Sequence, residues 1–494
     1  MKIHSSLGCL AGRKSRCLSS SLFAALALAL APAGVAQVVL PPDPQLTCTL
    51  TPQQFASWFA SGKVTLNGLV TPPNSVTFQH QNPCEFYQWS AQMFLWITSQ
   101  TSASGGHVFD SPTFYGVSVA DSSGNRTLIP NQPGTYRSLA VRNGQVGRNS
   151  KLLKVSGGTV TEVEQGQAGG NGVLMSQGKS LVYYTIDVND VYAWLVTGTK
   201  NGGIQPTPTQ FPTSGAQLLP IVTYAAKNGK ILTDAQALTL ELKTSWIDAS
   251  TVSNPSQYIT MTAEIPTYNT SSNTQWTPSG SKLVTLAMVG MHVVGSVNGH
   301  PEMSWATFEH INNAPNGAYS YVNNKGAIVQ VPQNTAGNWL FSASNASGTF
   351  NTENMSVSGG NIVAATGQTI APSNTLRVNP WGGASDAANN SQIIAINNAV
   401  MSMLPPGDVR RNYMLVGATW TNGIIPNSPG YQTIGSQTLA NATMETYHQN
   451  LNCFVCHSGS PGDQPSISFA QDDLSHIFSA ILALPTTPQP AATR

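Results

Sequence analysis

Two cysteines and a histidine near the end of the chain have the spacing of a haem attachment site. Cys453, Cys456 and His457 lie in the stretch "NCFVCHSGS". In a C-x-x-C-H motif, one helical turn brings both thiols to the two vinyl groups of a porphyrin, and the next residue points its imidazole at the iron. The motif predicts one covalently bound haem c, attached through Cys453 and Cys456, with His457 as the proximal axial ligand.

Two other uses of the motif fit less well. A structural zinc site needs four ligands, and no second Cys/His pair lies nearby at the usual spacing. A thioredoxin-like dithiol would open a helix after a strand in a βαβ pattern, and no such pattern precedes Cys453. The motif therefore indicates haem.

The second axial ligand is less evident, because no Met follows His457. His476 lies opposite the apolar stripe of "DDLSHIFSAILAL", which predicts a solvent-facing position. Met444 lies on a predicted helix, "LANATMETYHQNLNC", that leads into the motif, where packing is its commoner use. Both are candidates for the distal position, and so are His292 and His310 in the middle of the chain.

His292, His300 and His310 fall close together in the sequence, near Trp305. Each of the three histidines fits a hydrogen-bonded core position, but their concentration also suggests a distal ligand, a substrate pocket or a small metal site. The period of a strand places His310 on one face of "SWATFEHI" and both Glu309 and Trp305 on the other.

The beginning of the chain predicts export. Basic residues from Lys2 to Arg16 precede the apolar run "SLFAALALALA" and the small residues "PAGVAQ". This is the pattern of a Sec-type signal peptide, residues 1–36, cleaved between Ala36 and Gln37. The apolar run is too short to span a membrane. We expect a periplasmic or secreted protein with no membrane span.

Charge and cysteine usage narrow the class of protein further. Only 9% of the residues are charged and the formal net charge is +1, so nothing indicates a nucleic-acid partner. A redox partner protein is expected, but the sequence does not identify it. In an oxidising compartment Cys48 and Cys84 are the natural disulfide pair, with two free buried thiols as the alternative.

The helix and strand signals predict an α+β fold. Residues 37–104 form a helical N-terminal segment, with caps at Thr51 and Asn82 and a capping box at Glu85. Residues 105–385 form an antiparallel β-rich body, and residues 386–494 a C-terminal segment with the haem-bearing helices. The predicted strands are "KSLVYYTIDV", "VYAWLVTGT", "TLELKTSWI", "QYITMTAEI", "KLVTLAMVGMHVVGSV" and "NYMLVGATWT". Loops are predicted at "GGIQPTPTQFPTSG" and "NTSSNTQWTPSGS", and helices at "NNSQIIAINNAVMSML" and from Gln437 onward.

Several stretches resemble an uncharacterised family of exported bacterial cytochrome c-like proteins with one C-terminal CxxCH haem site. They are "VYYTIDVNDVYAWL", "ELKTSWI", "HPEMSWATFEHINNAP", and "LANATMETY" followed by "CFVCH". The resemblance extends from about residue 80 to the C-terminal helix. It implies a single covalent haem on a large β-rich domain and no particular reaction; only Cys453, Cys456 and His457 carry over by motif.

The leading interpretation is a mono-haem c-type cytochrome that transfers single electrons. One alternative is a haem enzyme of the peroxidase or oxygenase type with an open distal site, in which His310 or His292 acts as acid or base and Trp305 as a radical relay. The other is a β module that binds a polymer or a partner protein and carries a redox haem. No catalytic residue is assigned.

Overall fold

Both N-terminal helices begin at the caps that the sequence predicts. The Thr51 hydroxyl caps α1 (Pro52–Ser57) by accepting a hydrogen bond at 3.2 Å. The Glu85 carboxylate accepts a hydrogen bond at 3.2 Å from the N-cap N–H of α2 (Pro83–Ile97), which completes the capping box. α1 is shorter than predicted, because it ends well before Gly62.

A disulfide joins Cys48 to Cys84, as the sequence predicts. It ties the segment before α1 to the first turn of α2, and the two Cα atoms lie 5.1 Å apart. Both cysteines are buried. Disulfides persist in oxidising compartments, so this bond agrees with a protein that functions outside the cytoplasm.

The computed structural model describes residues 36–101, 106–132, 136–139, 141, 172–427, 431–458 and 471–486. The predicted signal peptide lies outside these residues, apart from Ala36. The other helices are α3 (Asp190–Lys200), α4 (Gly215–Lys227), α5 (Ala387–Met403), α6 (Cys453–Cys456) and α7 (Gln471–Leu474). The strands are β1 (Phe114–Val117), β2 (Leu128–Pro130), β3 (Arg137–Ser138), β4 (Tyr183–Asn189), β5 (Leu240–Asp248), β6 (Thr260–Asn269), β7 (Gln275–Val297), β8 (His300–His310), β9 (Tyr319–Val322), β10 (Ile328–Val331), β11 (Met355–Ser358), β12 (Asn361–Ala364), β13 (Tyr413–Trp420) and β14 (Ile434–Gly435).

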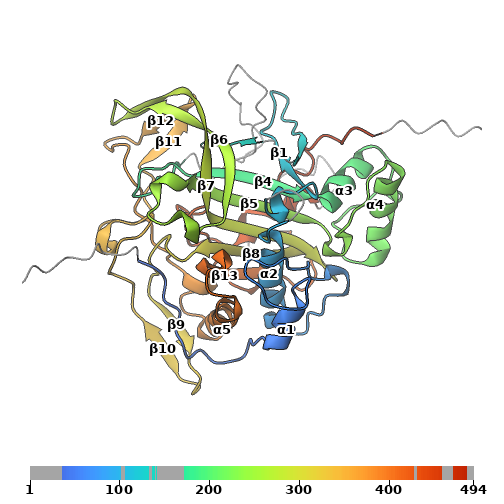
Figure 1. Ribbon diagram of the computed structural model, residues 1–494, viewed down its shortest axis with the longest axis horizontal. Helices are drawn as coiled ribbons and strands as arrows, with labels where there is room; N and C mark the ends of the chain where they lie inside the picture. Colours follow the sequence, from blue (N-terminus) through green and yellow to red (C-terminus); the bar gives the residue numbers. More distant parts are fainter. Residues whose placement is uncertain are drawn as a thin grey trace, which may run out of the picture. The chain divides into compact units, whose positions relative to one another are not determined.

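The strands form one large sheet with the order β14-β13-β8-β7-β5-β4-β1-β2 along its main path. Its named strands pair antiparallel, except for β3 with β6. The long strand β7 pairs with β6 along its first half and with β5 and β8 along its second half. Figure 1 shows β4, β5, β7 and β8 running through the middle of the fold. The predicted antiparallel, β-rich α+β fold is confirmed.

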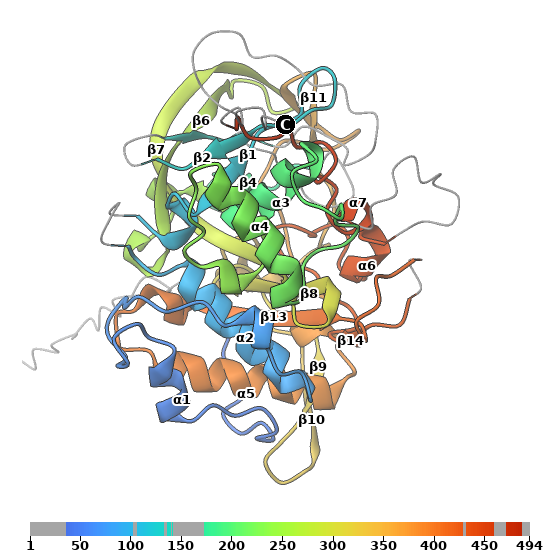
Figure 2. The ribbon, with the colours of Figure 1, turned by 90° about the vertical axis from the view of Figure 1, so that its right-hand side faces the viewer.

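The two faces of the central sheet are covered by different parts of the chain. Leu242, Met291 and Phe308 belong to a buried cluster with residues of α2 and α5, and we call this side the helix face. Val294 and Trp305 belong to a cluster with residues of α3, α4 and the segment that holds α6 and α7, and we call this side the motif face. Figure 2 shows α1, α2 and α5 grouped together, with α6 and α7 apart from them.

One predicted strand is a helix. The stretch "VYAWLVTGT" belongs to α3, because the Asn189 side chain accepts a hydrogen bond from the Tyr192 N–H at 3.1 Å and starts a helix where β4 ends. Most residues of α3 are buried, so packing outweighs the strand preference of its branched and aromatic side chains. α4, which follows the predicted loop at residues 202–215, has no counterpart among the predicted elements.

Two further predictions are wrong in part. The stretch "NTSSNTQWTPSGS" is not all loop, because β7 begins at Gln275. Residues 437–452 form turns and not the predicted helix, since their polar groups bond to the sheet; the Asn441 amide, for example, donates to the Phe308 carbonyl at 3.1 Å. Helical structure among the described residues after Gln437 is confined to α6 and α7.

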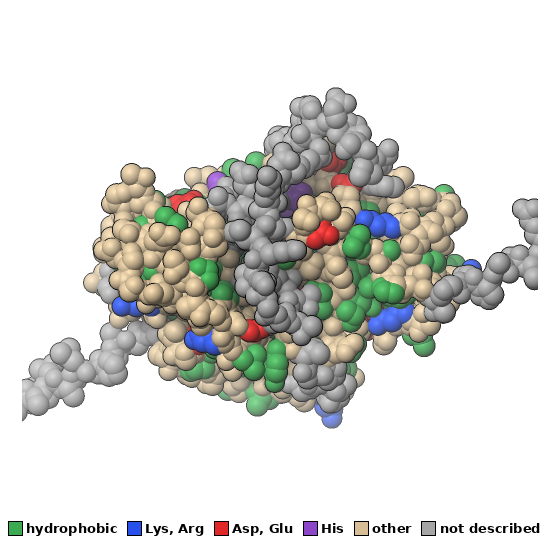
Figure 3. Space-filling model, turned by 90° about the horizontal axis from the view of Figure 1, so that it is seen from above, with side chains coloured by type: hydrophobic (Ala, Val, Ile, Leu, Met, Phe, Trp, Pro, Cys, Tyr) green, Lys and Arg blue, Asp and Glu red, His purple; other side chains and the backbone are tan. Residues whose placement is uncertain are grey.

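Charged side chains are sparse on the surface, as the composition implies. On the face shown in Figure 3, Lys, Arg, Asp and Glu side chains are scattered and form no broad single-sign patch among the described residues. None of the helices within the described ranges combines the length and the apolar composition needed to cross a membrane.

Candidate haem attachment site

The C-x-x-C-H motif forms a short helix at the end of a turn-rich segment. Asn452 caps α6 by accepting a hydrogen bond from the Phe454 N–H at 3.0 Å. The same side chain donates to the Ser436 carbonyl at 3.1 Å, which fastens the motif to the sheet beside β14. His457 follows as the C-cap, and its N–H bonds to the Cys453 carbonyl at 2.9 Å. One turn of chain therefore holds both thiols and the imidazole together.

Phe454, between the two cysteines, orients α6 on the motif face. Its side chain is 1% exposed and meets the Trp305 ring edge to face, with centroids 5.8 Å apart. Cys456 consequently faces outward and is exposed, while Cys453 is partly buried. Both cysteines are free thiols, in contrast to the disulfide-bonded pair of the N-terminal segment.

The imidazole of His457 is held in one tautomer. Its Nδ1 lies 2.8 Å from the Leu474 carbonyl oxygen. Because a carbonyl only accepts, Nδ1 carries the proton and Nε2 keeps its lone pair. Burial, followed by the nearby His476, lowers the pKa of His457 well below its usual value, so the ring is neutral. A neutral imidazole anchored to a carbonyl through its other nitrogen is the usual state of a metal-binding histidine.

His476 packs directly on the motif. Its ring is stacked on that of His457, with centroids 4.3 Å apart and planes inclined by 11°, and its Nε2 lies 3.0 Å from the Cys456 carbonyl oxygen. His476 is exposed, and the apolar residues around it in the sequence, among them Leu474 and Ile477, are buried, as the predicted stripe requires. The predicted helix is replaced by α7 and turns, and these turns bring the exposed ring back onto His457.

His292 reaches the same site through a carboxylate. The Nε2 atom of His292 lies 3.0 Å from Oε1 of Glu445. In the pairing of β5 with β7, His292 lies opposite Lys243. Burial alone would raise the pKa of Glu445, but the charges of His292 and Lys243 and the hydrogen bonds to the carboxylate lower it below its usual value. A negative charge is therefore kept next to the motif.

The two thiols of the motif are held in their protonated form. Burial, followed by the charge of Glu445, raises the pKa of both Cys453 and Cys456 above the usual value for a thiol. Redox-active dithiols have the opposite property, because a lowered pKa supplies the nucleophilic thiolate. This environment argues against a thioredoxin-like role.

The segment before the motif, residues 441–449, lies against the motif face. The Thr443 hydroxyl lies 2.7 Å from the Ser245 hydroxyl, and Glu309 accepts a backbone N–H of the segment at 2.8 Å. Gly290 permits this approach, because a Cβ atom there would lie 2.7 Å from the hydroxyls of both Ser245 and Thr443. The position of α6 is thus set by contacts with β5, β7 and β8.

The two remaining distal candidates lie elsewhere. His310 is on the helix face, stacked on Tyr258 with centroids 3.9 Å apart, and burial lowers its pKa to about 3. Met444 is fully buried in a separate apolar cluster. Because β-strand side chains alternate between faces, the pairing of β7 with β8 places His292 and His310 on opposite sides of the sheet. The structure brings His292 and His476 to the motif, and neither His310 nor Met444.

The histidine-rich stretch is dispersed. Nδ1 of His300 lies 2.7 Å from Oε1 of Glu302, and the His300 ring packs edge to face with Phe86 from α2. These contacts are not shared with His292 or His310. Within the described residues, no three His, Cys, Asp or Glu side chains form a group able to hold a metal ion. The structure adds two charged residues to the site, Lys243 on β5 and Glu445 in the turns before the motif. The sequence signal for Lys243 is a charge within the apolar strand "TLELKTSWI".

The buried carboxylate of Glu241 lies close to the segment whose Leu474 carbonyl bonds His457. The Ser475 hydroxyl, next to Leu474, donates to Oε2 of Glu241 at 2.6 Å and lies 2.6 Å from the Tyr192 hydroxyl. Burial raises the pKa of Glu241 to about 7, although the Ser475 hydrogen bond acts in the opposite direction. The segment that holds His457 is therefore linked to the sheet through an acid that titrates near neutral pH.

Replacing Glu241 with Gln should stabilise the protein at alkaline pH. The folded state binds the Glu241 proton more tightly than the unfolded state, so this group costs no stability below about pH 4.5 and an increasing amount as pH rises to 7. We expect Glu241→Gln to raise the free energy of unfolding by about 2 kcal/mol at pH 8 and by little at pH 4. Urea unfolding at pH 4, 6 and 8 measures this, with the exposed Glu353→Gln as control; an equal gain at all three pH values would contradict it.

Comparison of the chain with known protein families, with characterised proteins and with solved structures finds no match. The resemblance to exported cytochrome c-like proteins stays a prediction. Support for a function therefore comes from the residues of the motif and their surroundings.

Proposed function

We propose that this chain is an exported mono-haem c-type cytochrome that holds one haem through Cys453 and Cys456 and transfers single electrons. The observation that carries the proposal is the hydrogen bond from His457 to the Leu474 carbonyl, at 2.8 Å. It prepares a neutral imidazole with a free Nε2 beside two unpaired thiols. The residues present fit a covalently attached haem, which would supply an iron that changes between two oxidation states.

The surrounding side chains would tune such a group. Trp305 lies 4.4 Å from the His457 ring, and with the buried Phe454 it gives the motif an apolar side that excludes water. The negative charge kept on Glu445 would favour the more positive, oxidised state of a bound haem, and so would lower its reduction potential. The exposed Cys456 side of α6 leaves a route for a redox partner protein to approach.

Export is part of the same proposal. The Cys48–Cys84 disulfide agrees with a periplasmic or secreted location, and c-type haem is attached outside the cytoplasm. We place the chain with the exported cytochrome c-like proteins that its sequence resembles, on the strength of Cys453, Cys456 and His457.

The test is a visible spectrum of the full chain expressed with c-type haem maturation, recorded oxidised, reduced, and reduced with carbon monoxide. Covalent haem with sharp reduced bands that carbon monoxide does not change would support an electron carrier with two protein ligands. His292→Ala would then test the second ligand, with His476→Ala as the comparison from the ring stacked on His457 and His310→Gln as the control from the helix face. A carbon monoxide shift in the unaltered protein would favour the haem enzyme, and absence of covalent haem would contradict the proposal.

A further inference from the structure

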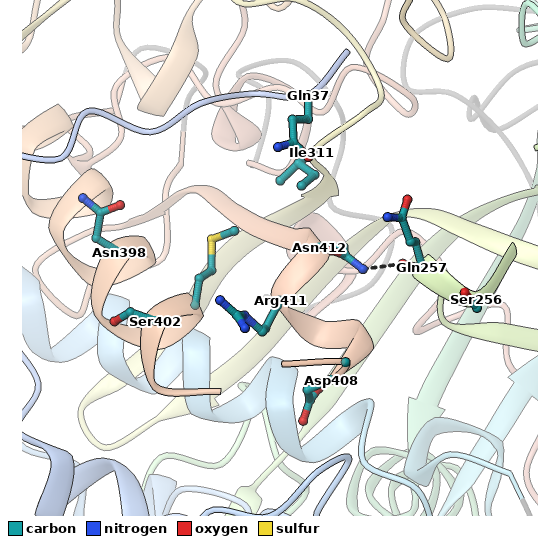
Figure 4. A pocket seen from close by; sticks show the side chains of 11 residues that line it. Gln37, Ser256, Gln257, Ile311, Asn398, Ser402, Asp408, Arg411 and Asn412 are labelled. Carbon is teal, nitrogen blue, oxygen red and sulfur yellow. Dashed lines mark hydrogen bonds between the residues drawn. The ribbon is translucent and has the colours of Figure 1, made fainter. Parts of the chain in front are cut away.

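A cavity of about 650 Å³ lies apart from the motif, between α5, the short turn of helix Val409–Asn412 and the loop before β6. Its lining mixes polar and apolar side chains, and the polar ones include Gln37, Gln257, Asn398, Ser402, Asp408, Arg411 and Asn412. Figure 4 shows these side chains around the cavity on separate elements, with the Arg411 guanidinium lying between Ser402 and Asn412. The volume falls in the range typical of small-molecule sites, roughly 300–1,000 Å³.

Arg411 carries an uncompensated charge in this cavity. Its nearest acid, Asp408, is saturated: Oδ1 accepts from Nε of Arg410 at 2.8 Å, and Oδ2 accepts from Nη2 of Arg410 at 2.6 Å and from the Asn67 N–H at 3.0 Å. Among the residues that the structure describes, no hydrogen bond or ion pair involves the Arg411 guanidinium, which is only partly exposed. The planar Arg411 guanidinium, with its N–H donors, therefore lines the cavity.

Two neighbouring amides donate their hydrogen bonds to backbone carbonyls. Asn412 donates its Nδ2 to the Gln257 carbonyl at 2.8 Å, and Asn398 donates its Nδ2 to the Pro41 carbonyl at 2.8 Å. Neither amide oxygen bonds to another of the described residues, so each can accept from a ligand hydroxyl. Ile311 and Met401 add apolar surface to the same lining.

We propose that this cavity binds a sugar acid, with Arg411 paired to its carboxylate and the side-chain amides bonded to its hydroxyls. A guanidinium binds a carboxylate through two parallel N–H···O bonds. Several amide and hydroxyl groups match a ligand with several hydroxyls, and the apolar side chains match the C–H faces of a sugar ring.

The experiment is isothermal titration of the full-length protein with glucuronate, glucose and acetate. Glucuronate is expected to bind at least tenfold more tightly than either of the other two. Arg411→Gln should weaken glucuronate binding at least tenfold. Arg411→Lys keeps the charge but loses the two parallel N–H donors of the guanidinium, and it should weaken binding less. The exposed Lys325→Gln is the matched control and should change nothing.

A second variant keeps the test independent of Arg411. Ser402, exposed on α5 at the cavity, can be replaced with Trp to fill the space, and this should abolish binding of glucuronate. Binding that persists in the Cys453→Ser/Cys456→Ser variant would support a site separate from the motif. Equal affinity for glucose and glucuronate, equal affinity for acetate and glucuronate, or full binding by Arg411→Gln would overturn the proposal.

Discussion

Replacing Cys453 and Cys456 together with serine is expected to abolish covalent haem attachment completely while the fold is retained. Serine hydroxyls form no thioether bond with a porphyrin vinyl group, so haem would no longer survive denaturing electrophoresis. Cys456 is exposed and Cys453 partly buried, so the free energy of unfolding should change by at most about 1 kcal/mol. Haem-stained gels and urea unfolding measure the two effects separately.

The other cysteine pair supplies a matched control. Cys48→Ser/Cys84→Ser removes a disulfide between residues separated by 36 positions, which should cost roughly 3–4 kcal/mol of stability. The folded fraction of that variant should still carry covalent haem. If instead Cys453→Ser/Cys456→Ser kept its haem, or if both double variants lost haem in proportion to unfolding, the motif would not be the attachment site.

Replacing Arg377 with alanine is expected to destabilise the protein by about 3–5 kcal/mol. Arg377 is 1% exposed and pairs with Glu309, which is 0% exposed, through two of its nitrogens. With Arg377 removed, Glu309 would keep the Ala442 N–H at 2.8 Å and a longer contact from Asn313 at 3.4 Å, which do not compensate a buried charge. Urea unfolding followed by tryptophan fluorescence gives the magnitude.

Arg411→Ala is the matched control for this prediction. Arg411 lies on the cavity wall and has no ion-pair partner among the described residues, so its loss should change stability by less than about 0.5 kcal/mol. Glu309→Gln in the Arg377→Ala background removes the unpaired charge and should recover part of the loss. Equal effects of Arg377→Ala and Arg411→Ala would show that the buried pair does not stabilise the fold.

The Arg377 variant also tests how the motif is positioned. Glu309 holds the backbone of the segment 441–449, which leads into α6. Arg377→Ala should therefore raise amide hydrogen exchange in this segment more than in α2 on the opposite face of the sheet. A uniform rise across the protein would indicate global destabilisation alone.

Several features of this protein could be predicted from the sequence because they depend on residues close together in the chain. The C-x-x-C-H motif needs one helical turn, and residues four apart in a turn are close whatever surrounds them. Capping of α2 by Glu85 is local in the same sense, and so is the alternation along β8, which places Phe308 and Trp305 in different buried clusters; both predictions are confirmed. The Cys48–Cys84 pair followed from the small number of cysteines in an oxidising compartment.

Contacts between distant segments decided the rest. The stretch at α3 has strand-forming side chains but is helical, because it packs in a buried cluster with the C-terminal segment. His292 and His310 looked equivalent in the sequence, and only the pairing of β7 with β8 placed one beside Glu445 and the other against Tyr258. The cavity around Arg411 is assembled from the chain near Gln37, Gln257, α5 and Asn412, and no periodicity in the sequence brings such separate positions together.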